Sequence, residues 1–351
     1  MVEPAREGSA EVPGLALGSV TRWLEDRTEL TPPLVATAIA GGRSNLTYRL
    51  EDAAGRLLVL RRPPLHSVLE SAHDVAREHR IQTALAATDV PVPRCLGLEA
   101  TGEVTGAPFY VMEHVEGVVV RDAEVARSAL TEPVRAAASR DLVDVLVRLH
   151  AVDIDRVGLG SLARREDYLA RQLGRWKRQL DQVRSRDVAI LDEVHARLTA
   201  RIPPQGPAAI VHGDYRLDNL LLDPATGAVT AVLDWELTTL GDPLADLGLL
   251  LVYWAEPTDT SVPLPDPPTG VEGFLRRDDL VDRYASASGR DVAEIGFHVA
   301  FGYWKLACIL EGVHRRHQDG AYGDADGFAG LGALVLGLGE LASQAATEVG
   351  R

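Results

Sequence analysis

The stretch Val211-His212-Gly213-Asp214-Tyr215-Arg216-Leu217-Asp218-Asn219, followed by Leu233-Asp234-Trp235-Glu236, decides how this chain is interpreted. Asp214, Asn219 and Asp234 have the spacing that phosphoryl transfer from a nucleotide requires. One Asp accepts a proton from a hydroxyl, while the Asn and the later Asp hold Mg²⁺ on the phosphates. Apolar runs flank these residues, so we expect them in loops at strand ends. Two ordinary turns rich in Asp and Asn are the plainer alternative.

Three neighbours of Asp214 are predicted to support it. Arg216, two residues later, is a cation that can neutralise charge developing on a transferred phosphoryl group. His212 is expected to orient the loop by hydrogen bonding rather than to transfer protons. Asp246 lies inside an apolar helical run, where a carboxylate is costly unless it is hydrogen bonded. We therefore expect Asp246 to brace the loop through backbone N–H groups, with a partly exposed helix acid as the alternative.

A glycine-rich turn, Gly41-Gly42-Arg43-Ser44-Asn45, lies between two predicted strands. Glycines allow a backbone to approach phosphates closely, and the side chains of Ser44 and Asn45 add donors. Gly41, Gly42, Ser44 and Asn45 are therefore predicted to bind the nucleotide phosphates. The turn lacks the G-x-G-x-x-G spacing, so a plain hairpin turn stays open.

Any phosphate-pairing cation in the N-terminal half must be an arginine, because the chain's lysines are Lys177 and Lys305 alone. Arg61 ends the strand after the glycine-rich turn, and Glu78 lies in the following helix as its predicted partner. Arg62 is the adjacent candidate, although strand alternation points it to the opposite face. A solvated arginine with a surface glutamate is the other alternative.

Composition indicates an ordinary globular enzyme. The length of 351 residues is enough for about two domains. Of these residues 46% are hydrophobic and 25% are charged, as in an average globular protein. Its net charge of -15 argues against a nucleic-acid partner. Cys95 and Cys308 show no disulfide or metal spacing. The first residues lack a signal-peptide pattern, and the apolar segment 328–338 is too short for a membrane span, so we expect a cytoplasmic protein without a membrane partner.

The order of elements predicts an α+β chain. Residues 1–32 are expected to form a tail and a short helix over Trp23–Leu30. Strand patterns with one main helix, over 70–87, then dominate residues 33–115. After residue 116 the patterns are mainly helical. A helix that contains Leu142, Val145, Leu146 and Leu149 is expected to end near His150. Further helices are expected over 165–183, 187–198, 244–255, 278–287, 293–317 and 325–346.

With these residues together, the chain resembles the aminoglycoside phosphotransferase-like family, whose members are relatives of protein kinases. The resemblance covers about residues 33–345, and Gly241-Asp242-Pro243-Leu244-Ala245-Asp246-Leu247 adds to the motifs quoted above. Arg61-Arg62-Pro63-Pro64 and the Tyr168…Arg171-Gln172…Trp176 pattern are similar to the branch of kinase domains fused to acyl-CoA dehydrogenases.

The resemblance implies a bilobal, protein-kinase-like α+β fold. An N-terminal mixed β-sheet lobe with one main helix, 33–115, would bind the nucleotide. A larger, mainly helical C-terminal lobe, 116–351, would carry the catalytic loop, the metal site and the acceptor site. Asp214 would be the catalytic base, and Arg61 replaces the lysine found in most of the superfamily. The implied metal ligands are Asn219 and Asp234, and the implied adenine-binding hinge contains Met112, Glu113 and Val115.

The expected activity is that of an ATP- and Mg²⁺-dependent kinase that transfers the γ-phosphoryl group to a hydroxyl of a small molecule. The branch suggests a hydroxyacyl-CoA-like acceptor, whose phosphates could meet Arg171, Arg175 and Arg178 on one helix face. An aminoglycoside or another antibiotic is the alternative, because the segment from Glu256 to Glu294 holds nine acids against four arginines. A catalytically silent nucleotide-binding module is the alternative of another class.

Overall fold

The computed structural model describes residues 14–39, 45–64, 74–259, 265–320 and 330–348. Gly41, Gly42 and Ser44 therefore lie outside the described residues. The chain divides into two compact units. One contains Met1–Glu116 together with Asp234–Glu236, and the other contains Gly117–Leu233 together with Leu237–Arg351.

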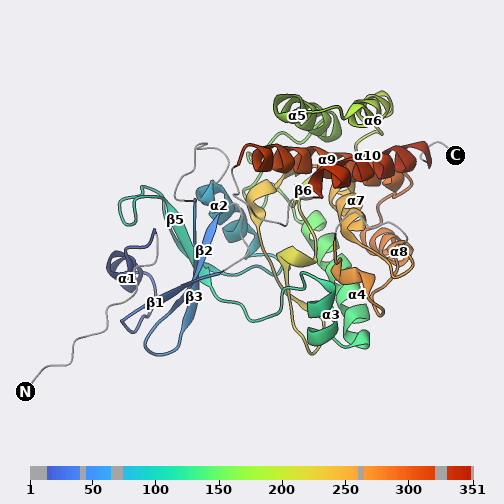
Figure 1. The fold of residues 1–351 in the computed structure, drawn as a ribbon. Coiled ribbons are helices and arrows are strands. Elements are labelled where there is room, and N and C mark those ends of the chain that lie inside the picture. The colour runs from blue at the N-terminus through green and yellow to red at the C-terminus, as the bar shows by residue number, and fades with distance from the viewer. Residues whose placement is uncertain (1–13, 40–44, 65–73, 260–264, 321–329, 349–351) are drawn as a thin grey trace, which may run out of the picture. The chain divides into compact units, whose positions relative to one another are not determined.

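The first unit is built on a five-stranded antiparallel sheet of order β1-β2-β3-β5-β4 (Figure 1). Strands β2 and β3 form a hairpin, with Leu46 paired to Arg62 and Glu51 to Leu57. The main helix, α2, packs against β4 and β5. The elements are α1 Leu17–Glu25, β1 Val35–Ala38, β2 Leu46–Glu51, β3 Leu57–Arg62, α2 Val75–Leu85, β4 Cys95–Glu99 and β5 Phe109–Glu113.

The first helix differs from its prediction over Trp23–Leu30. It begins at Leu17 and ends at Glu25, because Val20 and Leu24, one helical turn apart, are fully buried against the sheet. Tertiary burial of this stripe therefore sets the helix boundaries.

The second unit is mainly helical, as expected, with two short strand pairs. Its elements are α3 Ala123–Ala129, α4 Glu132–Ala151, α5 Tyr168–Val183, α6 Ala189–Ala200, β6 Ala209–Val211, β7 Leu220–Leu222, β8 Val229–Val232, β9 Thr239–Gly241, α7 Leu244–Tyr253, α8 Arg277–Ser288, α9 Ile295–Gln318 and α10 Leu331–Glu348.

The two strand pairs position the segment His212–Asn219. Strand β6, paired with β9, ends at Val211, and β7, paired with β8, begins at Leu220. The hairpin also brings Asn219 beside Leu233, whose N–H donates to the Asn219 carbonyl at 2.8 Å. Asp234 is the next residue, so the hairpin links both ends of the predicted motif.

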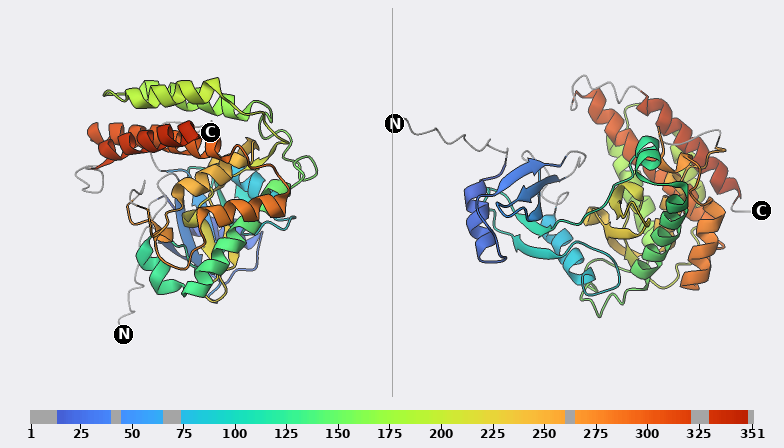
Figure 2. Two further views of the ribbon diagram at one scale, coloured as in Figure 1. Left: turned by 90° about the vertical axis from the view of Figure 1, so that its right-hand side faces the viewer. Right: turned by 90° about the horizontal axis from the view of Figure 1, so that it is seen from below.

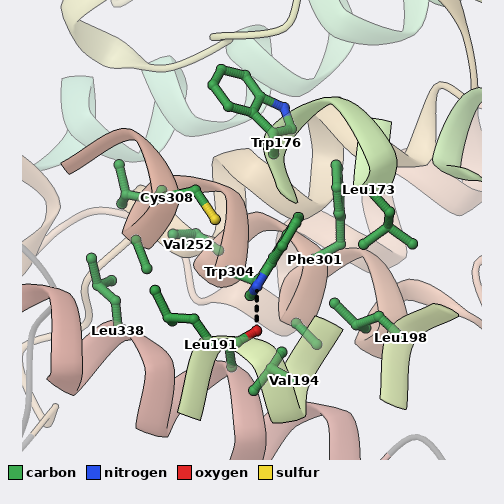
Figure 3. Packing of buried hydrophobic residues seen from close by; sticks show 14 of the residues in the cluster. Leu173, Trp176, Leu191, Val194, Leu198, Val252, Phe301, Trp304, Cys308 and Leu338 are labelled. Carbon is green, nitrogen blue, oxygen red and sulfur yellow. Dashed lines mark hydrogen bonds between the residues drawn. The ribbon is translucent and has the colours of Figure 1, made fainter. Parts of the chain in front are cut away.

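The core of the second unit lies among α5, α6, α7, α9 and α10. Helices α5 and α6 form a layer over α9 and α10 (Figures 1 and 2). At the centre of this core the indole of Trp304 donates to the Leu191 carbonyl at 2.9 Å (Figure 3). Helix α7 crosses α9 closely at Gly248, where a Cβ would lie 2.6 Å from the His298 carbonyl carbon. Within the described ranges, none of the helices combines the length and apolarity needed to cross a bilayer.

Candidate active site

A buried carboxylate from α7 holds the start of the loop that carries Asp214. Asp246 is fully buried and accepts the N–H of His212 at 2.6 Å and that of Gly213 at 2.8 Å. Burial acts to raise the pKa of Asp246, but its bonds to His150 and Gly213 and nearby histidine rings hold this pKa below its ordinary value. The predicted bracing of the loop through backbone N–H groups is what the structure shows.

The His212 ring joins two backbone groups of the loop. Its Nε2 lies 2.9 Å from the Leu233 carbonyl, and its Nδ1 accepts the N–H of Asp214 at 3.2 Å. These partners require the tautomer with the proton on Nε2, because Nδ1 must accept. Both nitrogens are therefore used to orient the loop, as expected.

Gly213 has a backbone conformation that suits glycine. Its φ is +86°, in the left-handed region. A Cβ at this position would lie 2.8 Å from the carbonyl oxygen of Leu237. The motif therefore needs glycine between His212 and Asp214 for both conformation and space.

Asp214 and Asn219 contact each other directly. The Asn219 Nδ2 donates to the carbonyl oxygen of Asp214 at 2.8 Å and to its carboxylate Oδ2 at 2.9 Å. These two bonds fix the orientation of the Asn219 amide, with Nδ2 toward Asp214 and Oδ1 away from it. Among the described residues its Oδ1 has no hydrogen-bond partner, so a hard oxygen ligand remains for a cation.

Arg216 lies on the same loop and pairs with two acids. Its guanidinium is 2.7 Å from Asp218 and 3.6 Å from the Asp214 carboxylate, and it lies 4.5 Å from the Tyr253 ring centre. Burial raises the pKa of Asp218, and Arg216 acts against this shift. The predicted cation is thus beside Asp214.

A cavity of about 190 Å³ lies beside the pair formed by Arg216 and Asp218. One wall is the end of α7, with Leu250, Tyr253 and Trp254. The other wall comes from the segment that begins at Pro265. The remaining residues that line the cavity are Arg121, Leu217, Pro265, Pro267, Pro268 and Thr269.

In the first unit, Arg61 is shared by two acids. Its Nε is 2.9 Å from Glu78, and its terminal nitrogen is 2.5 Å from Asp234 Oδ1. Glu78 is 1% exposed, and burial raises its pKa to about 7, with Arg61 acting in the opposite direction. The sequence-predicted pair of Arg61 and Glu78 is therefore formed, with Asp234 as a further partner.

Asn45 is the one described residue of the predicted phosphate-binding set. Its side chain is buried, and its Nδ2 donates to Glu78 at 2.6 Å. This contact supports the acid that pairs with Arg61. A role for Asn45 in phosphate binding stays a prediction.

Asp234 adopts a left-handed backbone conformation, with a φ of +64°. One carboxylate oxygen faces Arg61, while the described chain provides no hydrogen bond to Oδ2. Asn219 and Asp234 thus each retain an oxygen atom, and oxygen donors are what Mg²⁺ prefers. Each residue has the chemistry of a magnesium ligand, and the magnesium site stays a prediction.

The predicted hinge lies at the end of β5. The Met112 sulfur accepts from Gln82 at 3.2 Å, and the Glu113 N–H donates to the Arg94 carbonyl at 2.9 Å. Val115 follows the strand, and its N–H forms no hydrogen bond within the described ranges. Of the three hinge residues, Val115 therefore has a backbone donor available for a base.

One buried cation near the loop was not predicted as functional. Lys305 on α9 donates from Nζ to the Gly213 carbonyl at 2.7 Å. A sequence signal existed, because a single lysine interrupts the apolar run Phe301-Gly302-Tyr303-Trp304-Lys305-Leu306-Ala307-Cys308. The same reasoning that singled out Asp246 applies to it.

The antiparallel sheet, the helical second unit and the loop with paired Asp214 and Asn219 define a phosphotransferase of the protein-kinase-like fold. The family model described as "Phosphotransferase enzyme family" matches residues 35–289, and the chain belongs to this family. It is a kinase of small molecules that acts on hydroxyl groups.

Similar proteins agree with this assignment. Acyl-CoA dehydrogenase family member 10 of Mus musculus is 33% identical over 326 residues, which are 92% of this chain and 30% of that protein. The chain thus spans less than a third of this relative's length. A crystal structure of a candidate aminoglycoside phosphotransferase from Ralstonia eutropha has a TM-score of 0.80 and 30% identity, and covers 94% of this chain and 98% of its own. Choline kinase from Cryptosporidium parvum shares the fold, with a TM-score of 0.64, 11% identity and coverage of 94% and 95%.

Proposed function

We propose that this kinase transfers the γ-phosphoryl group of ATP, with Mg²⁺, to the hydroxyl of a hydroxyacyl-CoA-like compound. The observation that carries the proposal is the contact between Asp214 and Asn219 on a loop held by Asp246. A loop so constrained presents one carboxylate in a defined direction, which positioning-dominated phosphoryl transfer requires.

The residues of the chain have separate roles in this proposal. Asp214 orients the acceptor hydroxyl and accepts its proton as the oxygen attacks the phosphorus. Arg216, 3.6 Å from that carboxylate, offsets negative charge on the transferred group. Arg61 pairs with the nucleotide phosphates. Asn219 and Asp234 would hold magnesium, which when bound neutralises charge on the phosphate oxygens.

The arginines on α5 support an anionic acceptor. Arg175 and Arg178 are exposed, and neither forms an ion pair with the described residues. On the same helix Lys177 is paired with Asp181, and Arg184 just beyond it with Asp192. The basic face with Arg171, Arg175 and Arg178 is thus left unneutralised, which suits the phosphates of a CoA. The name of the mouse relative points to acyl-CoA chemistry as well.

An aminoglycoside acceptor is the second candidate, and it is favoured by the acids after residue 256. Two of these acids are already paired, since Asp259 and Glu256 both lie near Arg277. The cavity beside Arg216 is lined by two arginines against one acid, Asp218, and this excess of positive charge disfavours a polycation. We therefore place the acyl compound first.

The deciding experiment measures ADP release from ATP with hydroxyacyl-CoA thioesters, free hydroxy acids and aminoglycosides, with and without Mg²⁺. Turnover is expected with a hydroxyacyl-CoA and should be abolished by Asp214→Ala. Full turnover by Asp214→Ala would refute the assignment of the base. Absence of turnover with every hydroxyl compound, together with ATP binding, would favour the silent module.

Arg175→Glu distinguishes the two acceptor classes. With a hydroxyacyl-CoA we expect the KM of the acceptor to rise about tenfold, because one phosphate contact is reversed in sign. Arg140→Glu, at an exposed position of α4, is the matched control and should leave that KM unchanged. An equal effect of both variants would refute binding at the α5 face.

A further inference from the structure

Lys305 places its amino group in the interior of the second unit. Its side chain is 7% exposed, and its neighbours on α9 include the fully buried Trp304 and Cys308. Nζ lies 5.8 Å from the centre of the Trp176 ring and 2.7 Å from the Gly213 carbonyl oxygen. No ion pair joins Lys305 to a described residue, although burying an ammonium group costs several kcal/mol.

The lysine completes the restraint of the peptide group that precedes Asp214. The carbonyl of this peptide accepts from Lys305, and its N–H donates to His212 Nδ1 at 3.2 Å. Both polar atoms of the Gly213–Asp214 peptide are therefore bonded. The two preceding N–H groups are bonded to Asp246. Rotation of this peptide would turn the Asp214 carboxylate, and Lys305 opposes that rotation from the carbonyl side.

Electrostatics favour the same arrangement. Burial lowers the pKa of Lys305, while the carboxylates of Asp214 and Asp246 act to raise it. The ammonium group thus lies in the field of both acids that define the loop. A methionine of similar length would fill the space without the cost of a buried charge, and such replacements are often neutral or stabilising. Packing alone does not account for a lysine here.

We propose that Lys305 is a positioning residue that sets the direction of the Asp214 carboxylate by holding the Gly213 carbonyl. This inference rests on the proposed role of Asp214 as the base. It assigns to α9, 92 residues beyond the loop, a part in the reaction that does not involve contact with the substrate.

The test compares Lys305→Met with wild type in kcat, in the KM for ATP and in thermal stability. We expect kcat to fall about 10- to 100-fold, the effect of a small misplacement of a reacting group. The KM for ATP should change less than about twofold, and Tm should stay or rise, since the buried charge is gone. Lys305→Arg, which keeps a cationic donor, should recover part of the lost kcat.

Leu306→Ala is the matched control on the same helix, because Leu306 is 4% exposed and packs in the core. It should lower Tm and leave the kcat of the folded enzyme near that of wild type. A loss of folding or a lower Tm in Lys305→Met, or an unchanged kcat, would overturn the positioning role in favour of a purely structural one.

A double-mutant cycle with Asp214→Asn connects the effect to the base. In the Asp214→Asn background, Lys305→Met should change the residual rate less than about twofold, because residues that act through one group are not additive. An equal fold-change in both backgrounds would overturn the inference. If Asp214→Asn alone keeps full activity, the proposed function fails first. If it is inactive while Lys305→Met is fully active, only this inference fails.

Discussion

The loop that carries Asp214 and the strand end that carries Arg61 are held by different interactions. At the loop, polar side chains bond to backbone groups: Asp246 accepts two N–H groups, and Lys305 donates to a carbonyl. At Arg61, charged side chains bond to one another, through Glu78 and Asp234. Phosphates and cations compete with ion pairs far more than with backbone hydrogen bonds. We therefore expect the loop to be ordered before substrates bind, and the partners of Arg61 to rearrange when they do.

The largest effect is expected from removing the loop's brace. In Asp246→Asn, one N–H of the pair at His212 and Gly213 loses its acceptor, and an unsatisfied buried donor costs about 1–3 kcal/mol. We predict a fall in kcat of about 10²- to 10³-fold, the range for loss of a preorganised or correctly positioned group, with a lower Tm. Asp282→Asn, at an exposed position of α8, should change neither quantity. An active, stable Asp246→Asn enzyme would contradict the comparison.

Changes at Arg61 should act on the nucleotide instead. In Arg61→Ala we predict a rise in the KM for ATP of about 100-fold, because the phosphates lose their cation and the carboxylates of Glu78 and Asp234 are left unpaired. Arg61→Lys should stay within about tenfold of wild type, since the charge is kept but the planar fork is lost. A larger effect of Arg61→Lys on kcat than on KM would mean that Arg61 also shapes the reacting geometry.

The smallest effect concerns the pH dependence of Glu78. Its pKa of about 7 in the folded chain exceeds the ordinary value of 4.5. The folded state therefore binds this proton more tightly than the unfolded state does, and the stabilisation is lost as pH rises from 4.5 through 7.

Relative to Glu78→Gln, the wild-type free energy of unfolding should be greatest below about pH 4.5 and should fall by about 3 kcal/mol by pH 8. Denaturant titrations of both proteins at each pH measure the difference. A difference that grows with pH would mean that Arg61 keeps Glu78 ionised throughout this range.

The sequence predicts those parts of the site that follow from the position of a residue within its own element or from the free-energy cost of burying its charge. Asp246 was predicted because a carboxylate in an apolar helix must find donors, and its partners lie on a motif already recognised. Arg61 and Glu78 were predicted from their places on a strand and on the next helix. The helix patterns likewise gave α5 to α9 to within a few residues, and α10, predicted over 325–346, spans Leu331–Glu348. An apolar stripe marks α5, whereas α7 is buried nearly all round and was marked by its continuous apolar run. Residues 325–329 lie outside the described ranges.

The rest depended on packing between distant segments. The partner of Lys305 is a main-chain carbonyl, and no sequence pattern identifies a carbonyl as an acceptor. The Asn45 amide donates to Glu78, a contact between residues 33 positions apart that no local pattern specifies. Helix α3 was not predicted because its seven residues are too few to show a helical period. It begins after Asp122, whose carboxylate accepts the Val125 N–H.

Trp304 and Lys305, adjacent on α9, join the hydrophobic core and the Asp214 loop to one helix. Local opening of the loop must then disturb a helix whose neighbours fill the centre of the unit. The amide protons of His212 and Gly213 should accordingly exchange with solvent as slowly as those in the middle of α9, although they belong to a loop. The catalytic segment would share the opening free energy of the core, and it would resist local fluctuation as long as that core is intact.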